Sequence, residues 1–329
     1  MIKMERRRLA GAALIIVVFT SFCAAETHWN LQEVDGDGIY VHPGVGTSMV
    51  FTVEGIILNR PEEMVDTSEQ WQMYVQGENG DHAGTAVYMR KFNFPTGEGY
   101  SEQEWASEVN RAEHDINSNY KFQPGDRVRV TGLTWFYKGK SNINEQHRVS
   151  PAYDFVIDLI DPAVGLPEPE VIELDMIVNE PNIPIFDYTR LGGCERYQGM
   201  LVRINDVNIV GENWGPGQLM EIKDGSGRYF NLLLGRGQGF AKYSKPTGQI
   251  SVVGIFDQEA PAYDLTVGYR LWVMNYDGNG SVLTDNCGRN GYFAGDINKD
   301  CSINFLDLAE IAADWLKCSN PSYDECTIP

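Results

Sequence analysis

Short apolar runs rich in β-branched and aromatic residues recur in the first half of the chain and predict strands. The runs are residues 49–58, 71–75, 85–89 and 127–135, followed by a strand that ends near Val149. Between the third and fourth runs, Ser101 and Glu104 form a Ser-x-x-Glu capping box, which predicts a helix that continues through Ala112. Three strands, a helix and two strands predict one closed five-stranded barrel.

Two glycine-containing stretches refine this first unit. Gly55 interrupts the first run and predicts a bend or a bulge in its strand. Residues 77–84 are rich in Gly, Asn and Asp, which favours a turn that pairs the second and third runs as a hairpin.

A similar order of runs returns in the second half of the chain and indicates a duplicated unit. The segments that repeat the pattern are residues 197–204, the hairpin 219–234 with its Asp-Gly-Ser-Gly turn, 248–256 and 269–274. We therefore predict a mainly β protein with two tandem OB-like five-stranded barrels, at residues 49–151 and 193–288, and a small α-helical calcium-loop module at residues 289–329.

The segments that flank the predicted barrels have a different composition. Residues 26–48 are polar and Gly-rich, and we expect a loosely held lead-in. Residues 152–192 contain five prolines, which favour extended backbone and predict a stiff linker with only short structure near residues 171–176.

The C-terminal module holds a pattern of oxygen-bearing side chains at alternating positions. A twelve-residue calcium loop needs hard oxygen ligands at positions 1, 3, 5, 7, 9 and 12, the seventh through a backbone carbonyl. The residues at those positions are Asp296, Asn298, Asp300, Ser302, Asn304 and Asp307. The pattern favours a bound Ca²⁺ ion. The alternative is a solvated acidic turn in which Asn304 caps a helix without metal.

Both interpretations of the loop predict the same helix after it. The helix begins near Phe305, and its apolar residues Phe305, Leu308, Ala312 and Trp315 recur at spacings of three and four. One side of this helix is therefore expected to be apolar.

This loop and helix resemble one repeat of a type I dockerin, on the match of Asp296, Asn298, Asp300, Ile303, Asn304 and Asp307 to the dockerin pattern. The chain departs from that pattern in carrying Cys301 where dockerins usually have glycine, and in having one repeat where they normally have two. The resemblance implies docking to a cohesin-like or other cell-surface protein. It also implies a setting in polysaccharide breakdown, because such tails usually belong to carbohydrate-active enzymes.

The first 25 residues resemble a secretory signal peptide. A basic leader precedes the apolar run 9–19 and the small-residue exit Cys23-Ala24-Ala25, so we expect cleavage near Ala25 and a secreted protein. The apolar run is too short to span a membrane. A lipid anchor on Cys23, giving surface association, is the alternative.

The charge of the chain limits its partners. The formal net charge is −20, and removal of the leader, which holds four basic residues and one acidic residue, makes it −23. Because nonspecific nucleic-acid binding depends on Lys and Arg neutralising phosphates, this charge disfavours a nucleic-acid partner.

Five cysteines would remain after cleavage, and export permits disulfides. They are Cys194, Cys287, Cys301, Cys318 and Cys326. We expect a Cys194–Cys287 bridge across the ends of the second barrel. Cys301 and Cys318 flank the C-terminal helix, which leaves Cys326 unpaired.

The sequence assigns no catalytic or cofactor-binding residue. The five histidines are scattered without metal-ligand spacing, and no nucleophile elbow, His-Glu-x-x-His pair or phosphate loop is present. The chain is therefore more consistent with a noncatalytic protein. If it is an enzyme, a glycoside hydrolase with two facing carboxylates is the expected class.

Aromatic residues lie on the second and third predicted strands of both barrels, where OB folds can present a stacking surface. They are Trp71, Tyr74, Tyr88, Tyr229 and Phe230. The strand pattern favours barrel core for these residues over an exposed platform. An exposed platform in so acidic a chain would suit sugars better than nucleic acid.

Two functional hypotheses therefore stand side by side. The first is an exported noncatalytic adaptor or scaffold that attaches through a calcium-binding tail. The second is a component of polysaccharide breakdown that binds glycan or carries an unrecognised hydrolase site. A nucleic-acid binder built on the OB barrels is a third, less favoured hypothesis.

Overall fold

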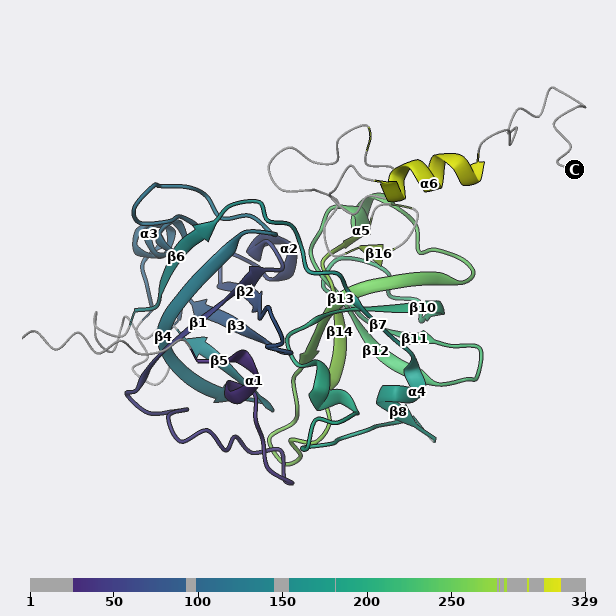
Figure 1. Cartoon of the computed structure of the whole chain (residues 1–329), viewed down its shortest axis with the longest axis horizontal. Helices are drawn as coiled ribbons and strands as arrows, with labels where there is room; N and C mark the ends of the chain where they lie inside the picture. Colours follow the sequence, from purple (N-terminus) through teal and green to yellow (C-terminus); the bar gives the residue numbers. More distant parts are fainter. Residues whose placement is uncertain are drawn as a thin grey trace, which may run out of the picture.

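Two β-barrels lie side by side and make up most of the described protein (Figure 1). The computed structural model describes residues 26–92, 99–144, 154–180, 182–276, 278, 281–282, 295 and 305–314. Helices are few and short within these ranges. The mainly β architecture predicted from the sequence is confirmed.

The first barrel contains the five predicted strands in the order expected of an OB fold. Its strands are β1 (Val50–Ile57), β2 (Gln70–Gln76), β3 (Gly84–Arg90), β4 (Arg127–Tyr137) and β5 (Lys140–Asn144). They follow the order β1-β2-β3-β5-β4, and β4 pairs with β1 to close the barrel. Helix α3 (Glu102–Glu113) joins β3 to β4 and begins at the predicted capping box. Short helix α2 (Pro61–Met64) lies between β1 and β2.

The second barrel repeats this topology. Its strands are β10 (Leu201–Val210), β11 (Leu219–Lys223), β12 (Tyr229–Leu234), β13 (Ile250–Gln258) and β14 (Tyr269–Val273). They follow the order β10-β11-β12-β14-β13, and β13 pairs with β10. Helix α5 (Gly239–Lys242) occupies the place of α3, and β15 (Asn275–Tyr276) and β16 (Ser281–Val282) extend the sheet.

Each barrel has its own apolar core, because alternate residues of every strand point inward. In β12, Phe230, Leu232 and Leu234 are buried while the residues between them are partly exposed. The core of the first barrel is built around the fully buried Trp71, which stacks on Phe155 at 5.7 Å between ring centroids.

Gly55 does not form the bulge expected from the sequence. The β1–β4 register runs through it without a shift. A Cβ atom at this position would lie 2.1 Å from the carbonyl oxygen of Gln76 on β2. The glycine is therefore explained by the close approach of a neighbouring strand within a regular sheet.

The N-terminal lead-in is packed rather than loosely held. Helix α1 (His28–Leu31) is capped by Thr27, and both His28 and Leu31 are fully buried. The His28 ring contacts Thr85 Oγ1 at 2.8 Å, and the Asp81 carboxylate accepts the backbone N–H of His28 at 2.7 Å. Leu31 and Val45 of this segment pack into the apolar core of the first barrel.

The Pro-rich segment has the short structure expected near residues 171–176, and it also contributes strands to both barrels, which the sequence did not indicate. Strand β6 (Val156–Asp161) pairs with β4, and β7 (Glu170–Ile172) pairs in parallel with β10. Helix α4 (Leu174–Ile177) and the strands β8 (Val178–Asn179) and β9 (Ile183–Pro184) follow. The connection between the barrels is thus tied to each of them.

The predicted C-terminal helix is present as α6 (Phe305–Asp314). Its apolar residues Phe305 and Leu308 are exposed, Phe305 to 86%. Asp307 lies within α6, whereas the other five proposed calcium ligands lie outside the described residues, as do the signal-like residues 1–25.

The expected Cys194–Cys287 bridge is not formed. Cys194 is a free and fully buried thiol that donates to the Ile177 carbonyl at 3.2 Å. Burial raises the pKa of this thiol well above its ordinary value, so it behaves as a small core residue. The other five cysteines of the sequence lie outside the described residues.

None of the helices in the described ranges combines the length and the apolar character that a membrane crossing requires.

Candidate functional site

The two barrels meet through an apolar interface of their own. Its buried residues are Leu58, Met64, Tyr74 and Ala86 from the first barrel and Leu201, Val253, Ile255, Trp272 and Met274 from the second. At one point the backbones touch: Gly84 N–H donates to the Gln198 carbonyl at 2.9 Å. A Cβ on Gly84 would lie 2.2 Å from the Gly199 oxygen, so this contact requires glycine.

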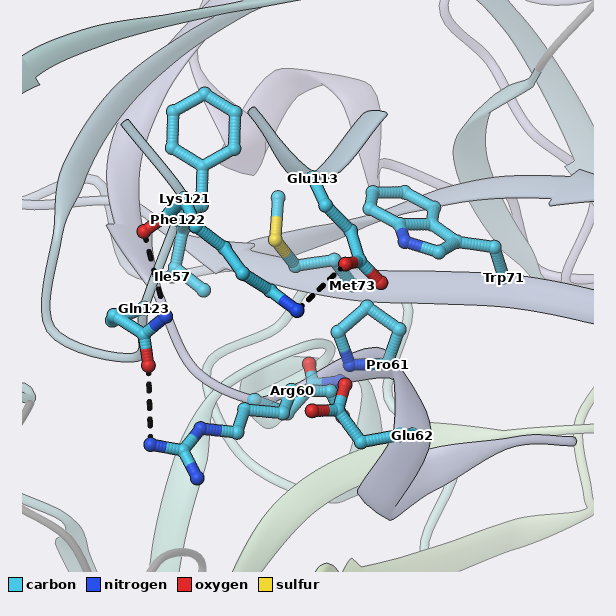
Figure 2. Close-up of a pocket in the computed structure, with 11 residues that line it drawn as sticks. Ile57, Arg60, Pro61, Glu62, Trp71, Met73, Glu113, Lys121, Phe122 and Gln123 are labelled. Atoms are coloured by element: carbon cyan, nitrogen blue, oxygen red, sulfur yellow. Dashed lines mark hydrogen bonds and ion pairs between the residues drawn. The ribbon is translucent and has the colours of Figure 1, made fainter. Parts of the chain in front are cut away.

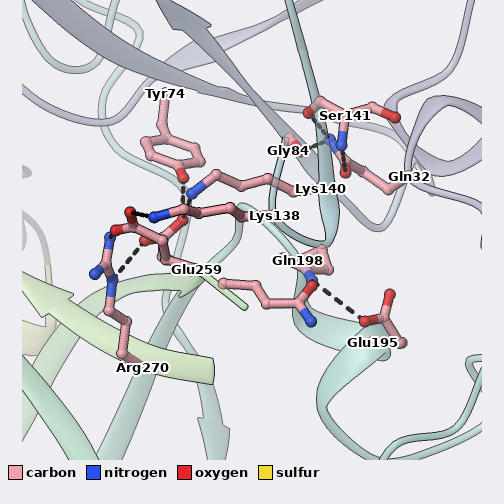
Figure 3. A network of polar contacts seen from close by, with 12 residues as sticks. Gln32, Tyr74, Gly84, Lys138, Lys140, Ser141, Glu195, Gln198, Glu259 and Arg270 are labelled. Carbon is pink, nitrogen blue, oxygen red and sulfur yellow. Dashed lines mark hydrogen bonds and ion pairs between the residues drawn. The ribbon is translucent and has the colours of Figure 1, made fainter. Parts of the chain in front are cut away.

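A buried charge cluster crosses the same interface (Figure 3). Asp257 of β13 is fully buried and accepts hydrogen bonds from Tyr74 O–H at 2.5 Å and Arg270 Nε at 2.8 Å, and it also pairs with Lys140 of β5. Glu259 accepts from Lys138 at 2.5 Å and from Arg270 at 2.8 Å. The cluster therefore joins the β4–β5 hairpin of one barrel to β13 and β14 of the other.

The cluster stabilises the ionised form of the Asp257 carboxyl, as the pKa of this group shows. Burial acts to raise the pKa of the carboxyl, but the positive charges of Lys140 and Arg270 outweigh it and lower the pKa to about 2. Asp257 is therefore ionised over the whole range in which the protein is expected to work.

A groove of about 650 Å³ opens beside this cluster, with walls from both barrels. The residues that line it are Val65, Gln70, Gln72, Ala86, Tyr88, Met89, Arg90, Tyr100, Trp135, Tyr137, Lys140, Asn142, Asn144, Glu259, Arg270 and Trp272. Most come from the outer surface of β2, β3, β5 and β4, and the last three close it from the second barrel. A groove of this size fits several sugar or base rings.

The floor of the groove is formed by alternate residues of strands β2 and β3. Residues two apart share one face of a strand, and the register pairs Gln70 with Arg90 and Gln72 with Tyr88 across β2 and β3. Burial raises the pKa of the Tyr88 hydroxyl, and the neighbouring Arg90 charge acts to lower it. Polar, aromatic and cationic side chains therefore alternate along the same surface.

The β4–β5 hairpin supplies the exposed aromatic residues. Trp135 is 51% exposed and Tyr137 is 47% exposed, and both line the groove. Trp135 lies opposite Asn142 in the register. Exposed rings two residues apart on a strand can stack on successive rings of a chain-like ligand, and carboxamide groups beside them can bond its hydroxyl groups.

A second hollow, of about 210 Å³, lies on the first barrel (Figure 2). Three of its four charged residues are engaged within it: Lys121 bonds Glu113 at 2.9 Å, and Arg60 donates to Gln123 Oε1 at 3.1 Å. This hollow is smaller and has no exposed aromatic ring. Within the described ranges, no group of three or more His, Cys, Asp or Glu side chains is arranged to hold a metal ion.

The aromatic residues singled out in the sequence divide between core and surface. Trp71 and Phe230 are barrel core, and Tyr74 is buried between the barrels. Tyr88 lines the groove, and Tyr229 is partly exposed on the second barrel.

Sequence reasoning missed Trp135 and Tyr137 as groove residues. The Tyr137-Lys-Gly-Lys140 sequence indicates a tight turn, and therefore a fourth strand that continues through Trp135 to Tyr137. Lys138 and Gly139 both have positive φ, of 51° and 98°, as a tight hairpin requires. Extending the fourth strand to that turn would have placed both rings on one face.

A separate buried polar cluster lies around Glu195 of the second unit. Glu195 is 1% exposed and accepts the Tyr269 O–H at 2.5 Å. Burial raises the pKa of this carboxyl to about 7, in spite of the Tyr269 and Gln198 hydrogen bonds and the nearby Arg190 charge. Arg190 stacks at 3.5 Å from the ring centroid of Trp29 and donates to the Trp29 carbonyl at 2.6 Å. The cluster ties the N-terminal segment to the second barrel.

Comparison with known proteins identifies no family for this chain. No protein-family model matches the sequence, and no curated protein matches it. Among solved structures, a murine DNA-binding protein bound with double-stranded DNA is similar at a TM-score of 0.30 and 12% identity, over 70% of this chain and 93% of that chain. A similarity at that level indicates neither a shared ligand nor a shared function.

Proposed function

We propose that this protein is an exported, noncatalytic carbohydrate-binding adaptor, which holds a glycan in the groove between its barrels and attaches to a partner through its C-terminal module. The observation that carries the proposal is the pair of exposed rings, Trp135 and Tyr137, beside the carboxamides of Asn142 and Asn144 in one groove. Aromatic faces stack on sugar rings, and carboxamides both donate to and accept from hydroxyl groups.

The acidic residues of the groove favour binding over hydrolysis. Glycoside hydrolases of the usual kind need two carboxylates that flank the scissile bond. Among the described residues that line the groove, Glu259 is the one carboxylate, and it is engaged by Lys138 and Arg270. This leaves a hydrolytic role without its second carboxylate at the groove.

The overall charge favours a glycan over a nucleic acid. The chain carries a formal net charge of −20, so a polyphosphate backbone would be repelled over most of its surface. A sugar polymer needs only local contacts with the groove.

The C-terminal module is proposed as the attachment device. Its helix α6 exposes the apolar side chains of Phe305, Leu308 and Ile311, and these residues recur at the spacing of one helix face. The dockerin-like loop sequence before it suggests that a cohesin-like or other cell-surface protein covers this face.

We expect the substitutions Trp135→Ala and Tyr137→Ala each to weaken polysaccharide binding about tenfold or more, since each removes a stacking surface worth on the order of 1–3 kcal/mol. Retention on a panel of insoluble polysaccharides, followed by affinity electrophoresis with the soluble ones, measures the change. The matched control is Tyr263→Ala, which removes a 91%-exposed aromatic residue outside the groove.

Retention of the parent protein with loss in the groove variants alone supports the proposal. Failure of the parent to bind any member of the panel would remove glycan binding from the proposal. Release of reducing sugar by the parent protein would overturn the noncatalytic role.

Calcium is expected to stabilise the C-terminal module, because an ion that binds only the folded form shifts the folding equilibrium by mass action. Loss of a loop carboxylate should abolish this effect, and we choose Asp300→Ala for the test. Far-ultraviolet circular dichroism of the full-length protein, recorded with calcium and then with chelator, follows the melting of this module.

A calcium-dependent transition that disappears in Asp300→Ala supports the ion-binding loop. The control is Asp264→Ala, which removes a carboxylate from an Asx-type turn on the second barrel. A melting profile of the parent that is identical with calcium and with chelator would leave only the capped-helix interpretation.

A further inference from the structure

We infer that the groove takes a neutral glycan, whose hydroxyl groups bond the carboxamides of Gln70 and Asn144 while its sugar rings stack on the exposed aromatic side chains. The inference rests on the proposed glycan-binding function and adds the chemical class of the glycan. Two features of the groove carry it: its charged side chains are engaged with partners in the protein, and two of its carboxamides lie beside an aromatic ring.

Three of the four charged side chains that line the groove belong to the buried charge cluster beside it. Lys140 and Arg270 both pair with the fully buried Asp257 carboxylate. Glu259 accepts from Arg270 at 2.8 Å and from Lys138 at 2.5 Å. An anionic ligand that drew either cation away from Asp257 would leave a buried carboxylate poorly compensated, which is strongly unfavourable. A cationic ligand would have to compete with two cations for Glu259.

The fourth charged residue of the lining, Arg90, is also engaged. A hydrogen bond joins it to the Tyr88 side chain, and the Tyr88 O–H donates to Gln70 Oε1 at 3.2 Å. This chain of hydrogen bonds begins on a cation and ends on the carboxamide of an exposed residue that lines the groove. The groups that the groove offers to a ligand are therefore largely uncharged.

Two carboxamides lie beside Tyr88. Gln70 bonds its hydroxyl, and Asn144 of β5 lies opposite Tyr88 of β3 in the parallel register. Both line the groove, Gln70 being exposed and Asn144 half-buried. On the other side of β5, Trp135 of β4 lies opposite Asn142. Because neighbouring strands are about 4.8 Å apart, a ligand that lies on these rings passes close to the carboxamides beside them.

The carboxamides present both donors and acceptors. Asn144 Nδ2 donates to Asn142 Oδ1, and this bond holds Asn144 with its own Oδ1 as an acceptor for a ligand. Gln70, whose Oε1 accepts from Tyr88, has its Nε2 group as a donor. A sugar hydroxyl both donates and accepts, so it matches both groups, whereas an ionised carboxylate only accepts. A neutral polyhydroxyl ligand is therefore the class that fits.

The test compares polysaccharides that share a backbone and differ in charge. Each neutral polymer that the protein retains is offered in hydroxyethylated and carboxymethylated forms of equal substitution, and each acidic polymer is offered before and after reduction of its carboxylates. Affinity electrophoresis and calorimetry of the full-length protein are done in chelator, so that calcium neither gels the acidic polymers nor acts on the C-terminal module.

We expect the neutral member of a pair to bind about tenfold more tightly than the acidic member, because acidic groups meet repulsion from the chain and cannot donate. The affinity for the neutral member should change less than about twofold as salt is raised, because no ion pair with the ligand is screened.

Variants of the two carboxamides test their role with almost no change in shape. Gln70→Glu and Asn144→Asp each replace a group that donates and accepts by one that only accepts, so each should weaken binding of the neutral member about tenfold. Thermal melting checks that both variants fold as the parent does. The matched control is Asn205→Asp, which changes an exposed carboxamide on β10 away from the groove.

The outcomes distinguish this inference from the function on which it rests. Equal or tighter binding of the acidic member, or parent-like binding by both carboxamide variants, would overturn the inference and leave glycan binding in place. Absence of binding to any polysaccharide would remove both. Tighter binding of a single-stranded DNA oligonucleotide than of any polysaccharide would overturn both in favour of a nucleic-acid ligand.

Discussion

Asp257→Ala is expected to lower the free energy of unfolding by about 3–5 kcal/mol, because removing one partner of a buried ion pair leaves the other charges uncompensated. The substitution leaves Lys140 without its counterion, leaves Arg270 paired with Glu259 alone, and removes the acceptor of the Tyr74 O–H. Chemical denaturation followed by tryptophan fluorescence measures the loss.

Lys138→Met provides the control for this prediction. Lys138 belongs to the same cluster but is 38% exposed, so its pair with Glu259 should contribute less than about 1 kcal/mol. Comparable losses in the two variants would show that the buried position of Asp257 has no special effect, contrary to the prediction.

The pH dependence of stability offers a second view of Asp257. Its pKa in the folded protein, about 2, lies below the ordinary value of 3.8. Its contribution to stability is therefore present above pH 3.8 and lost as the pH falls toward 2. When the free energy of unfolding is measured as the pH is lowered, Asp257→Ala should not show the part of the decrease that Asp257 causes in the parent protein.

The second large effect concerns Glu195, whose pKa in the folded protein is raised from 4.5 to about 7. Between these values the unfolded chain loses the proton and the folded protein keeps it, so stability should fall as the pH rises through this window. The total loss is on the order of 3 kcal/mol, at about 1.4 kcal/mol for each pH unit.

Glu195→Gln should abolish this pH dependence, because the amide cannot ionise and retains an oxygen that accepts from Tyr269 O–H. We expect the variant to resemble the parent below pH 4.5 and to be more stable above pH 7. Denaturation midpoints across this range test the prediction, with the exposed Glu212→Gln as control. Parallel pH profiles for the parent and Glu195→Gln would contradict the raised pKa.

The strand order of both barrels could be predicted because each strand carries its own local signal. Runs of β-branched residues mark β1 and β13, and the Ser101–Glu104 capping box marks α3. Gly55 shows the limit of such signals. A glycine in a strand indicates an unusual position, but only the register reveals that the Gln76 carbonyl lies against it.

The groove could not be predicted, because its residues acquire their setting from contacts distant in sequence. Trp71 and Trp135 both lie in apolar β-type runs, yet one is core and the other is exposed. Lys140 and Asp257 are 117 positions apart, and neither has a local pattern that indicates its partner. The face that each aromatic residue occupies follows from how the barrels close and meet.

The lead-in and the Pro-rich segment show the same dependence on tertiary contacts. Their composition suggests a loosely held lead-in and a stiff linker, and yet His28 and Leu31 are fully buried, and β6 and β7 each join one of the two sheets. A few buried side chains and backbone hydrogen bonds suffice to order a segment whose remaining residues are polar.

The Gly84–Gly199 contact has a consequence for how such a chain can evolve. Two copies of one fold have become unequal partners, because any side chain at either glycine would push the barrels apart. Neither barrel can therefore be replaced by another OB barrel that lacks the matching glycine. A lone first barrel would keep Trp135 and Tyr137 but would lose the wall that contains Trp272 and would expose Lys140 without its counterion. The two copies form a single unit whose halves are inherited together.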